Sequence, residues 1–303
     1  MPVLKSFAGG ALFGESWGEG VPTVLALHGW QRTHLDFVPV VDAAADLPGG
    51  PLAAVGLDLA GFGATPPPPE PWGSEEYART LLPLFEEPGV LADRIVLVGH
   101  SFGGRVAVHL APLVPDRIER VVLTAVPLLD RAGRRSRPAA GFRMARALHR
   151  MGLVGEERME AQRQKYGSPD YRAAQGVMRA VFVKLLAEQY AEQMAAINGP
   201  VDLVWGDADT DVPLEVAERA LPLFSSARLV TLPGVGHLIP TEAPRALAEV
   251  IVGRPTDGTA SDPLDQPLDD PLDDPLDDPL DDPLDDPLDE SLEHPDPHPG
   301  PPR

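Results

Sequence analysis

Residues 95–108 read IVLVGHSFGGRVAV. The stretch begins with an apolar, β-branched run as long as a buried strand and continues as a helical pattern rich in small residues. Between the two, residues 99–103 fit G-x-S-x-G, a sharp strand-to-helix turn that exposes a serine hydroxyl at the top of a sheet. The glycines are needed there because strand and helix approach closely. The pentapeptide alone fits either a simple tight turn or a nucleophile, so the rest of the chain has to decide.

Apolar runs of the same kind predict further buried strands. They begin at Thr23 (TVLALHG), Leu52 (LAAVGLDLAG), Arg94 (RIVLVGH), Ile118 (IERVVLTAV), Val201 (VDLVWGD) and Ala227 (ARLVTLPG). Helical patterns lie between them, at residues 34–46, 74–87, 102–113, 214–224 and 242–251. This alternation predicts right-handed βαβ units and an α/β fold with a doubly wound, mostly parallel sheet. Residues 3–18 are expected to form an antiparallel hairpin at the sheet edge.

Residues 128–198 interrupt the alternation, because they contain helical stretches and no strand run. An insertion of this length predicts a helical cap above the carboxyl edge of the sheet, where open α/β sheets bind their ligands. The expected organisation is therefore a core made of residues 1–127 and 199–253, a cap over 128–198, and a tail over 254–303.

The tail repeats PLDD, with a proline at every fourth residue from Pro263 to Pro287. This spacing is incompatible with a helix or a regular strand ladder, and the aspartates repel one another, so we expect an acidic, disordered tail. From Asp257 onward, 17 acidic residues stand against one arginine, so −16 of the net charge of −21 lies in residues 257–303. Residues 1–256 carry only −5 and give no sign of nucleic-acid binding.

The predicted cap carries the opposite charge over residues 131–165, which hold ten Lys or Arg and three Glu. A helix with a solvated basic face is the ordinary interpretation, and a basic lid that touches membrane surfaces or anionic substrates is a second. The third is an intramolecular contact, in which the tethered acidic tail transiently screens the basic segment of the cap. If that contact does not form, the tail serves as a solubility appendage.

The chain contains no cysteine, which excludes disulfides, a thiolate nucleophile and Cys-ligated metal sites. No cofactor and no metal are expected. No apolar stretch is long enough for a signal peptide or a membrane span, so we expect a cytoplasmic protein with no integral membrane segment. The oligomeric state is left open.

A serine nucleophile needs a base, and the base needs an acid to orient it. PGVGHLIPTEAP follows the last predicted strand and places His237 on a glycine-flanked loop. WGDADTDVP follows the strand before it and offers Asp207, Asp209 and Asp211. Asp209, three residues beyond the glycine that ends the strand, is best placed to reach the imidazole. Asp207 is expected to cap the loop, and Asp211 to be the N-cap of the following helix.

The other histidines are weaker candidates for the base. His100 is expected to point away from the serine, His109 to lie mid-helix, His34 and His149 to lie on helical surfaces, and His294 and His298 to lie in the tail.

Two backbone N–H groups complete the predicted site. LHGW ends the first parallel strand, where Gly29 would allow a tight turn that presents the Trp30 N–H to an oxyanion. The Phe102 N–H, at the start of the helix after Ser101, would be the second donor. The alternative is an ordinary strand-terminal turn with His28 packed underneath.

With these motifs in this order, residues from about 20 to 253 resemble the α/β-hydrolase family. The resemblance rests on LHGW, DLAGFGAT, GHSFGG, WGDADTDVP and GVGHLIPTEAP. It implies a Ser-Asp-His triad of Ser101, Asp209 and His237, with Trp30 and Phe102 as oxyanion-hole donors. Asp58, in DLAGFGAT, looks like the structural loop carboxylate of the family. The usual proline of that motif is replaced by Ala60.

A serine at the elbow argues against the haloalkane dehalogenases and epoxide hydrolases of this fold, which use aspartate, and GHSFGG does not resemble the elbow of prolyl aminopeptidases. The resemblance implies a serine hydrolase that works through an acyl-enzyme, in the first place a carboxylesterase for a small or medium ester. A carbon–carbon bond hydrolase or a cofactor-free perhydrolase on the same triad remains open, as does a non-catalytic ligand-binding relative. Lactonases are a further possibility on this fold.

Overall fold

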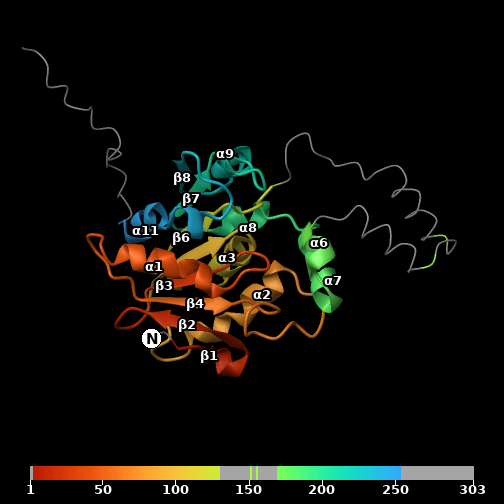
Figure 1. Cartoon of the computed structure of the whole chain (residues 1–303), viewed down its shortest axis with the longest axis horizontal. Helices are drawn as coiled ribbons and strands as arrows, with labels where there is room; N and C mark the ends of the chain where they lie inside the picture. The colour runs from red at the N-terminus through yellow and green to blue at the C-terminus, as the bar shows by residue number, and fades with distance from the viewer. Residues whose placement is uncertain (1–2, 130–150, 152–154, 156–168, 254–303) are drawn as a thin grey trace, which may run out of the picture. The chain divides into compact units, whose positions relative to one another are not determined.

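The computed structural model describes residues 3–129, 151, 155 and 169–253. In this part of the chain one sheet has the strand order β1-β2-β4-β3-β5-β6-β7-β8 (Figure 1). Its strands are β1 (Lys5–Phe7), β2 (Leu12–Trp17), β3 (Val24–Leu27), β4 (Ala54–Asp58), β5 (Ile95–His100), β6 (Ile118–Thr124), β7 (Val201–Gly206) and β8 (Ala227–Leu232). The six strands from β3 to β8 are parallel to one another, and β1 and β2 form an antiparallel hairpin at one edge, in which β2 pairs antiparallel with β4. The doubly wound, mostly parallel sheet and its edge hairpin are therefore confirmed.

The predicted helices are present: residues 102–113 form one helix, whereas 34–46, 74–87 and 214–224 are each divided into an α-helix and a 3-10 helix. The α-helices are α1 (Val38–Ala44), α2 (Ser74–Thr80), α3 (Phe102–Leu113), α6 (Pro169–Ala173), α7 (Gly176–Leu185), α8 (Ala191–Ala196), α9 (Leu214–Ala220), α10 (Ile239–Glu242) and α11 (Pro244–Val252). The 3-10 helices are η1 (Ala8–Gly10), η2 (His34–Phe37), η3 (Leu82–Phe85), η4 (Pro115–Arg117) and η5 (Leu221–Leu223). A proline lies in the first turn of η3, η5 and α11, where its missing N–H is tolerated and the preceding helix cannot continue.

The core has two parts, one on each face of the sheet. Alternate residues of one strand point to opposite faces, so Leu25 and Leu27 of β3 belong to one cluster and Val24 and Ala26 to the other. The first cluster includes α2, α3 and α9, and the second includes α1 and α11, which pack against each other in Figure 1. Burial on both faces explains why the strands are continuous apolar runs.

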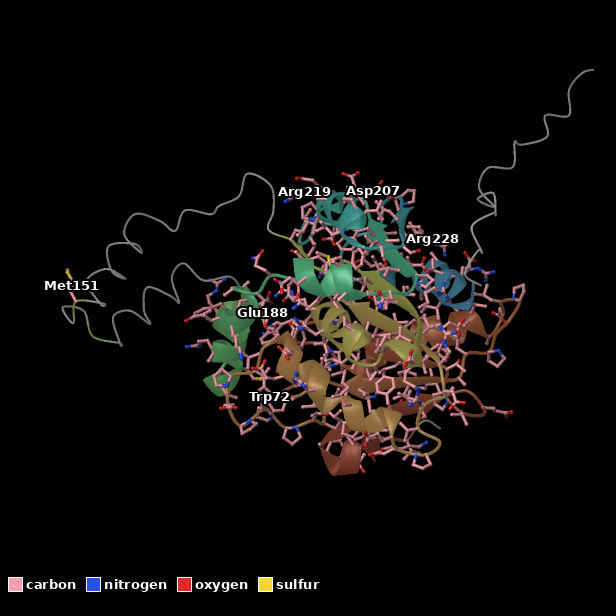
Figure 2. The ribbon with its side chains drawn as sticks, turned by 180° about the vertical axis from the view of Figure 1, so that it is seen from behind. Trp72, Met151, Glu188, Asp207, Arg219 and Arg228 are labelled. Atoms are coloured by element: carbon pink, nitrogen blue, oxygen red, sulfur yellow. The ribbon has the colours of Figure 1, made fainter. Side chains whose placement is uncertain are left out.

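The described part of the predicted cap, residues 169–198, contains α6, α7 and α8 and no strand. Val181, Leu185 and Met194 bury it in the core, and polar contacts add to this attachment. Glu188, beside the green helix α7 in Figure 2, accepts the Ser74 N–H at 2.8 Å and the Ser74 hydroxyl at 2.6 Å. The Lys184 ammonium donates to Glu76 of α2 at 2.5 Å, and Arg105 of α3 donates to the carbonyl of Leu185 at 2.8 Å. These bonds hold the end of α7 against α2 and α3.

Several predictions concern residues outside the described part of the chain. The basic segment 131–165, apart from residues 151 and 155, and the whole tail 254–303 lie there, so the screening of one by the other stays a prediction. The proposed boundaries at 127/128, 198/199 and 253/254 also stay predictions. Within the described residues, no helix is both long and apolar enough to cross a membrane.

Candidate active site

Ser101 lies at the end of β5 in a strained backbone conformation, with φ +48° and ψ −109°. Its N–H donates to the carbonyl of Thr124 at 2.8 Å, and its own carbonyl accepts the Gly104 N–H at 3.1 Å. A Cβ on Gly99 would lie 2.5 Å from the Gly104 Cα, so the strand and helix meet at van der Waals distance. A non-glycine residue with positive φ costs free energy and is concentrated at functional sites. The turn has the geometry expected of a nucleophile elbow.

The loop after β8 places the His237 imidazole beside this serine. Its Nε2 is 3.1 Å from the Ser101 hydroxyl oxygen, and its Nδ1 is 2.8 Å from Oδ2 of Asp209. An ionised carboxylate only accepts hydrogen bonds, so Nδ1 carries the proton and Nε2 is free to accept the serine O–H. The structure thus brings together three side chains from the ends of β5, β7 and β8, and these are the three that the sequence predicted.

Asp209 is fixed from both sides of its carboxylate. Its side chain is fully buried, and its second oxygen, Oδ1, accepts the N–H groups of Asp211 and Val212, each at 2.8 Å. The indole N–H of the buried Trp205 donates to the carbonyl of Val212 at 2.8 Å and holds the same turn from below. Neither Val212 nor Trp205 was singled out from the sequence, because their contribution depends on the path of the turn.

The two neighbouring aspartates have other positions. Asp207 accepts the Gly234 N–H at 2.7 Å and so joins the two loops that carry Asp209 and His237. The prediction that Asp211 is the N-cap of the next helix is wrong. Pro213 occupies the N-cap position of α9, in an extended conformation and without a side-chain cap bond.

Trp30 and Phe102 present the two predicted backbone donors. Phe102 is the first residue of α3, where a helical N–H has no intrahelical partner. Among the described residues, neither the Trp30 nor the Phe102 backbone N–H has a hydrogen-bond acceptor. The adjacent Gly103 N–H, in contrast, donates to the carbonyl of His28 at 2.9 Å, which holds the start of α3 against the end of β3.

The constraint on Gly29 differs from the one predicted. Its φ is not positive; the residue with positive φ in this turn is Gln31, at +56°. A Cβ on Gly29 would instead lie 3.0 Å from the ring of His100. Nδ1 of His100 is hydrogen-bonded to Oγ1 of Thr124 at 3.0 Å. The centroid of the His100 ring lies 5.2 Å from that of the His237 ring. Burial lowers the pKa of His100 to about 3, and the neighbouring His237 acts in the same direction, so a neutral imidazole lies beside the base.

The prediction for His34 is also wrong. It is not on a helical surface but is buried in η2, where its Nδ1 lies 2.7 Å from Oδ1 of Asp58. The other oxygen of Asp58 accepts the Ala64 N–H at 2.8 Å. Asp58 therefore holds the loop after β4, as expected of a structural carboxylate. His109 lies within α3 as predicted, and His149, His294 and His298 are outside the described residues.

Glu242 was not singled out from the sequence. Its carboxylate accepts the N–H groups of Gly236 at 2.7 Å and Leu238 at 3.0 Å, one on each side of His237. An acid at the start of a helical pattern, five residues after the histidine, was the available signal, because carboxylates pair with free N–H groups at helix starts.

Aromatic side chains surround the two backbone donors. The Trp30 ring lies 4.9 Å from Phe62, 5.5 Å from Phe102 and 5.1 Å from Phe182 of α7, between ring centroids. Met178, also of α7, packs against Gly61. The wall beside the donors is therefore apolar, and the cap contributes to it. No group of three or more His, Asp or Glu side chains suited to hold a metal ion is found among the described residues.

Comparison with known proteins gives matches that cover most of this chain. The sequence model of the Alpha/beta hydrolase family matches residues 24–250. The uncharacterized hydrolase YugF of Bacillus subtilis is 25% identical over 262 residues, which cover 77% of this chain and 89% of YugF. A 2-hydroxy-6-oxononadienedioate/2-hydroxy-6-oxononatrienedioate hydrolase of Cupriavidus pinatubonensis is 23% identical over 262 residues. The match covers 78% of this chain and 87% of that hydrolase.

The fold has solved counterparts. The structure of a thermophilic esterase from Thermogutta terrifontis superimposes with a TM-score of 0.58 at 23% identity, covering 83% of this chain and 96% of the esterase. At that identity the likeness concerns the fold. Because the family model matches far more than half of the sequence and the strand order and elbow agree with it, this chain belongs to the alpha/beta hydrolase family.

Proposed function

We propose that the protein is a serine hydrolase that works through an acyl-enzyme, with Ser101 as nucleophile, His237 as base and Asp209 as the orienting acid. The observation that carries the proposal is the continuous hydrogen-bonded chain from the Ser101 hydroxyl through both nitrogens of His237 to a buried carboxylate. The family and its hydrolase-named relatives support hydrolase activity.

In this mechanism the Ser101 oxygen attacks the carbonyl carbon while His237 Nε2 takes the hydroxyl proton. Negative charge develops on the carbonyl oxygen, and the Trp30 and Phe102 N–H groups would stabilise it. Asp209 stabilises the imidazolium through Nδ1. His237 then protonates the leaving alcohol, and a water molecule activated by the same imidazole releases the acid.

A small or medium carboxylic ester is the proposed substrate. The apolar wall of Trp30, Phe62 and Phe182 suits an uncharged acyl or alcohol group better than an anionic one, because charged groups lose solvation against aromatic surface. The described helix α7 contributes Phe182 and Met178 to this region, so the cap is expected to influence substrate choice.

Carbon–carbon bond hydrolysis is the second candidate, and one observation favours it. The Cupriavidus pinatubonensis relative, similar over most of its length, is named as a hydrolase of 2-hydroxy-6-oxo dienedioates. A panel containing 4-nitrophenyl acetate, 4-nitrophenyl octanoate and a vinylogous 1,5-diketone separates the two reactions. Faster turnover of the diketone than of both esters would replace the esterase assignment while leaving the triad in place.

Replacement of Ser101 tests the nucleophile. Ser101→Ala is expected to abolish covalent labelling by a fluorophosphonate and to lower ester turnover by about 10⁴-fold or more. Circular dichroism and thermal unfolding should show a folded protein, because the hydroxyl is the only group removed. Hydrolysis within tenfold of the unmodified protein would remove this serine from the mechanism.

A further inference from the structure

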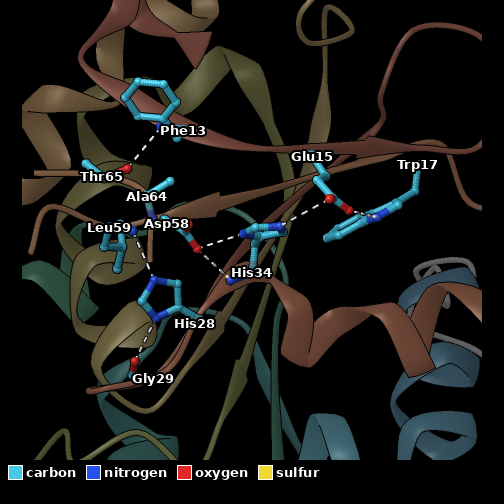
Figure 3. A network of polar contacts seen from close by, with 10 residues as sticks. All are labelled: Phe13, Glu15, Trp17, His28, Gly29, His34, Asp58, Leu59, Ala64 and Thr65. Carbon is cyan, nitrogen blue, oxygen red and sulfur yellow. Dashed lines mark hydrogen bonds and ion pairs between the residues drawn. The ribbon is translucent and has the colours of Figure 1, made fainter. Parts of the chain in front are cut away.

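The buried side chain of His28 joins the turn after β3 to the loop after β4 (Figure 3). Its Nδ1 lies 2.7 Å from the carbonyl oxygen of Gly29, and its Nε2 accepts the N–H of Leu59 at 2.9 Å. Its own backbone carbonyl accepts the Gly103 N–H at 2.9 Å. The histidine thus holds the turn after β3, the loop after β4 and the start of α3.

The Leu59 contact determines which ring nitrogen carries the proton. A backbone N–H only donates, so Nε2 has to be the acceptor, and the proton of a neutral ring is then on Nδ1. Nδ1 therefore donates to the Gly29 carbonyl. Burial lowers the pKa of His28 to about 4, which keeps the ring in this neutral form at ordinary pH.

The Gly29 carbonyl belongs to the same peptide unit as the Trp30 N–H. In a trans peptide the C=O and N–H point in opposite directions, so a bond that fixes the carbonyl also fixes the direction of the N–H. The Arg32 N–H also donates to this carbonyl, at 3.2 Å. The hydrogen bond from His28 Nδ1, at 2.7 Å, is the shorter of the two. On the other side, the bond from Gly103 to the His28 carbonyl fixes the residue next to Phe102.

We propose that His28 is the positioning residue of the oxyanion hole, and that its Nδ1–H aims the Trp30 N–H at the developing oxyanion. This inference rests on the proposed function. His28 touches no reacting atom. Its contribution is preorganisation: a donor already aimed at the oxyanion costs no reorientation during the reaction.

Asparagine and glutamine divide the two ring contacts between them. The amide nitrogen of asparagine occupies the place of Nδ1, so His28→Asn keeps a donor for Gly29 and leaves the Leu59 N–H without an acceptor. The amide of glutamine reaches the place of Nε2, so His28→Gln keeps an acceptor for Leu59 and loses the donor to Gly29. A purely structural role predicts that the more stable variant is the more active.

The experiment measures the second-order rate of Ser101 labelling by a fluorophosphonate, which needs no knowledge of the substrate. In the labelling step the Ser101 oxygen bonds to phosphorus, fluoride leaves and the hydroxyl proton passes to His237, while the phosphoryl oxygen takes the place of the oxyanion. The rate is expected to fall at least tenfold in His28→Gln and less than threefold in His28→Asn. Thermal unfolding of each variant gives the folded fraction by which rates are corrected.

His34→Asn is the matched control, because it removes another buried histidine that contacts neither Gly29 nor Gly103. Its corrected labelling rate should stay within threefold of the unmodified protein. Equal losses in both His28 variants, or a loss in His34→Asn as large as in His28→Gln, would overturn the proposal. Absence of Ser101-dependent labelling in the unmodified protein would overturn the proposed function itself, and the positioning role with it.

Discussion

At the scale of residues, the contacts of two neighbouring aspartates distinguish the proposed acid from the other carboxylate. Asp207 and Asp209 are two positions apart on one loop, yet only Asp209 reaches the His237 imidazole. Both oxygens of Asp209 are occupied, one by His237 and one by two N–H groups, so the carboxylate cannot turn away. Asp207 is bound to Gly234 instead.

Asparagine at each position gives a matched pair. Asp209→Asn keeps the shape but can donate to Nδ1, which favours the wrong imidazole tautomer, so kcat is expected to fall by about 10⁴-fold. Asp207→Asn keeps an oxygen that can accept the Gly234 N–H, and its kcat should stay within about threefold. Steady-state kinetics on one ester measure both. A larger loss of kcat in Asp207→Asn than in Asp209→Asn would contradict the assignment of Asp209 as the acid.

Glu242 is the second residue whose effect can be isolated. Glu242→Ala removes the acceptor for the N–H groups on both sides of His237, and an imidazole displaced by about 1 Å can cost up to about 100-fold in rate. We expect kcat to fall about tenfold or more with little change in KM. Glu249→Ala, which removes only an exposed bond to Arg245, is the control. Equal kinetics of the two variants would contradict a role for Glu242.

At the scale of elements, the site depends on how closely β3 and β5 approach α3. A Cβ on Gly103 would overlap the carbonyl oxygen of Leu27, and one on Gly104 would overlap Val126. The glycines of the elbow are therefore required by the contact between elements, whereas the strain is stored in the backbone of Ser101.

Gly103→Ala is expected to lower the free energy of unfolding by about 1–3 kcal/mol, as overpacking does elsewhere, and to slow fluorophosphonate labelling by moving α3. Gly199→Ala, where the new Cβ would lie 3.6 Å from its nearest neighbour, Glu119 O, should change neither. Urea unfolding and labelling rates measure the two effects. An unchanged labelling rate in a folded Gly103→Ala protein would contradict the dependence of the site on the close contact between α3 and β3.

For the whole molecule, two fully buried histidines make stability sensitive to acid. Burial lowers the pKa of His28 to about 4 and that of His100 to about 3, whereas an unfolded histidine titrates near 6.5. Below about 6.5 the unfolded chain binds protons at these positions that the native state does not. The contribution of His28 and His100 to the free energy of unfolding is therefore complete above about pH 6.5 and is lost as the pH falls toward 4.

His34 does not compensate in this range. Burial alone would lower the pKa of His34, but its bond to Asp58 and the charges of Asp58 and Glu15 raise it. A raised histidine pKa gives stability that is fully present below about 6.5 and lost only at higher pH. Its contribution is thus constant over the interval in which His28 and His100 lose theirs.

The free energy of unfolding should consequently decrease from pH 7 to pH 5, by about 1.4 kcal/mol per pH unit for each of the two histidines at the lower end. His100→Asn should remove about half of this dependence. Urea unfolding at the two pH values measures it. The same pH dependence in the variant would contradict the assignment of the effect to His100.

Local sequence patterns were enough to predict the sheet, the elbow at Ser101 and the candidate base and acid, His237 and Asp209. These follow from local patterns, because β-branched runs form strands, small residues allow a sharp turn, and the acid and base come at the ends of successive strands. The burial of His34, the contact at Gly29 and the bonds of His28 and Glu242 became apparent only in the folded chain. His34, Gly29 and His28 depend on partners that are distant in sequence, namely Asp58, His100 and Leu59, respectively. The bonds of Glu242, although local in sequence, depend on the exact path of the loop around His237. A hydrogen bond is made or lost within an ångström, and that distance is set by the packing of the whole sheet and its helices.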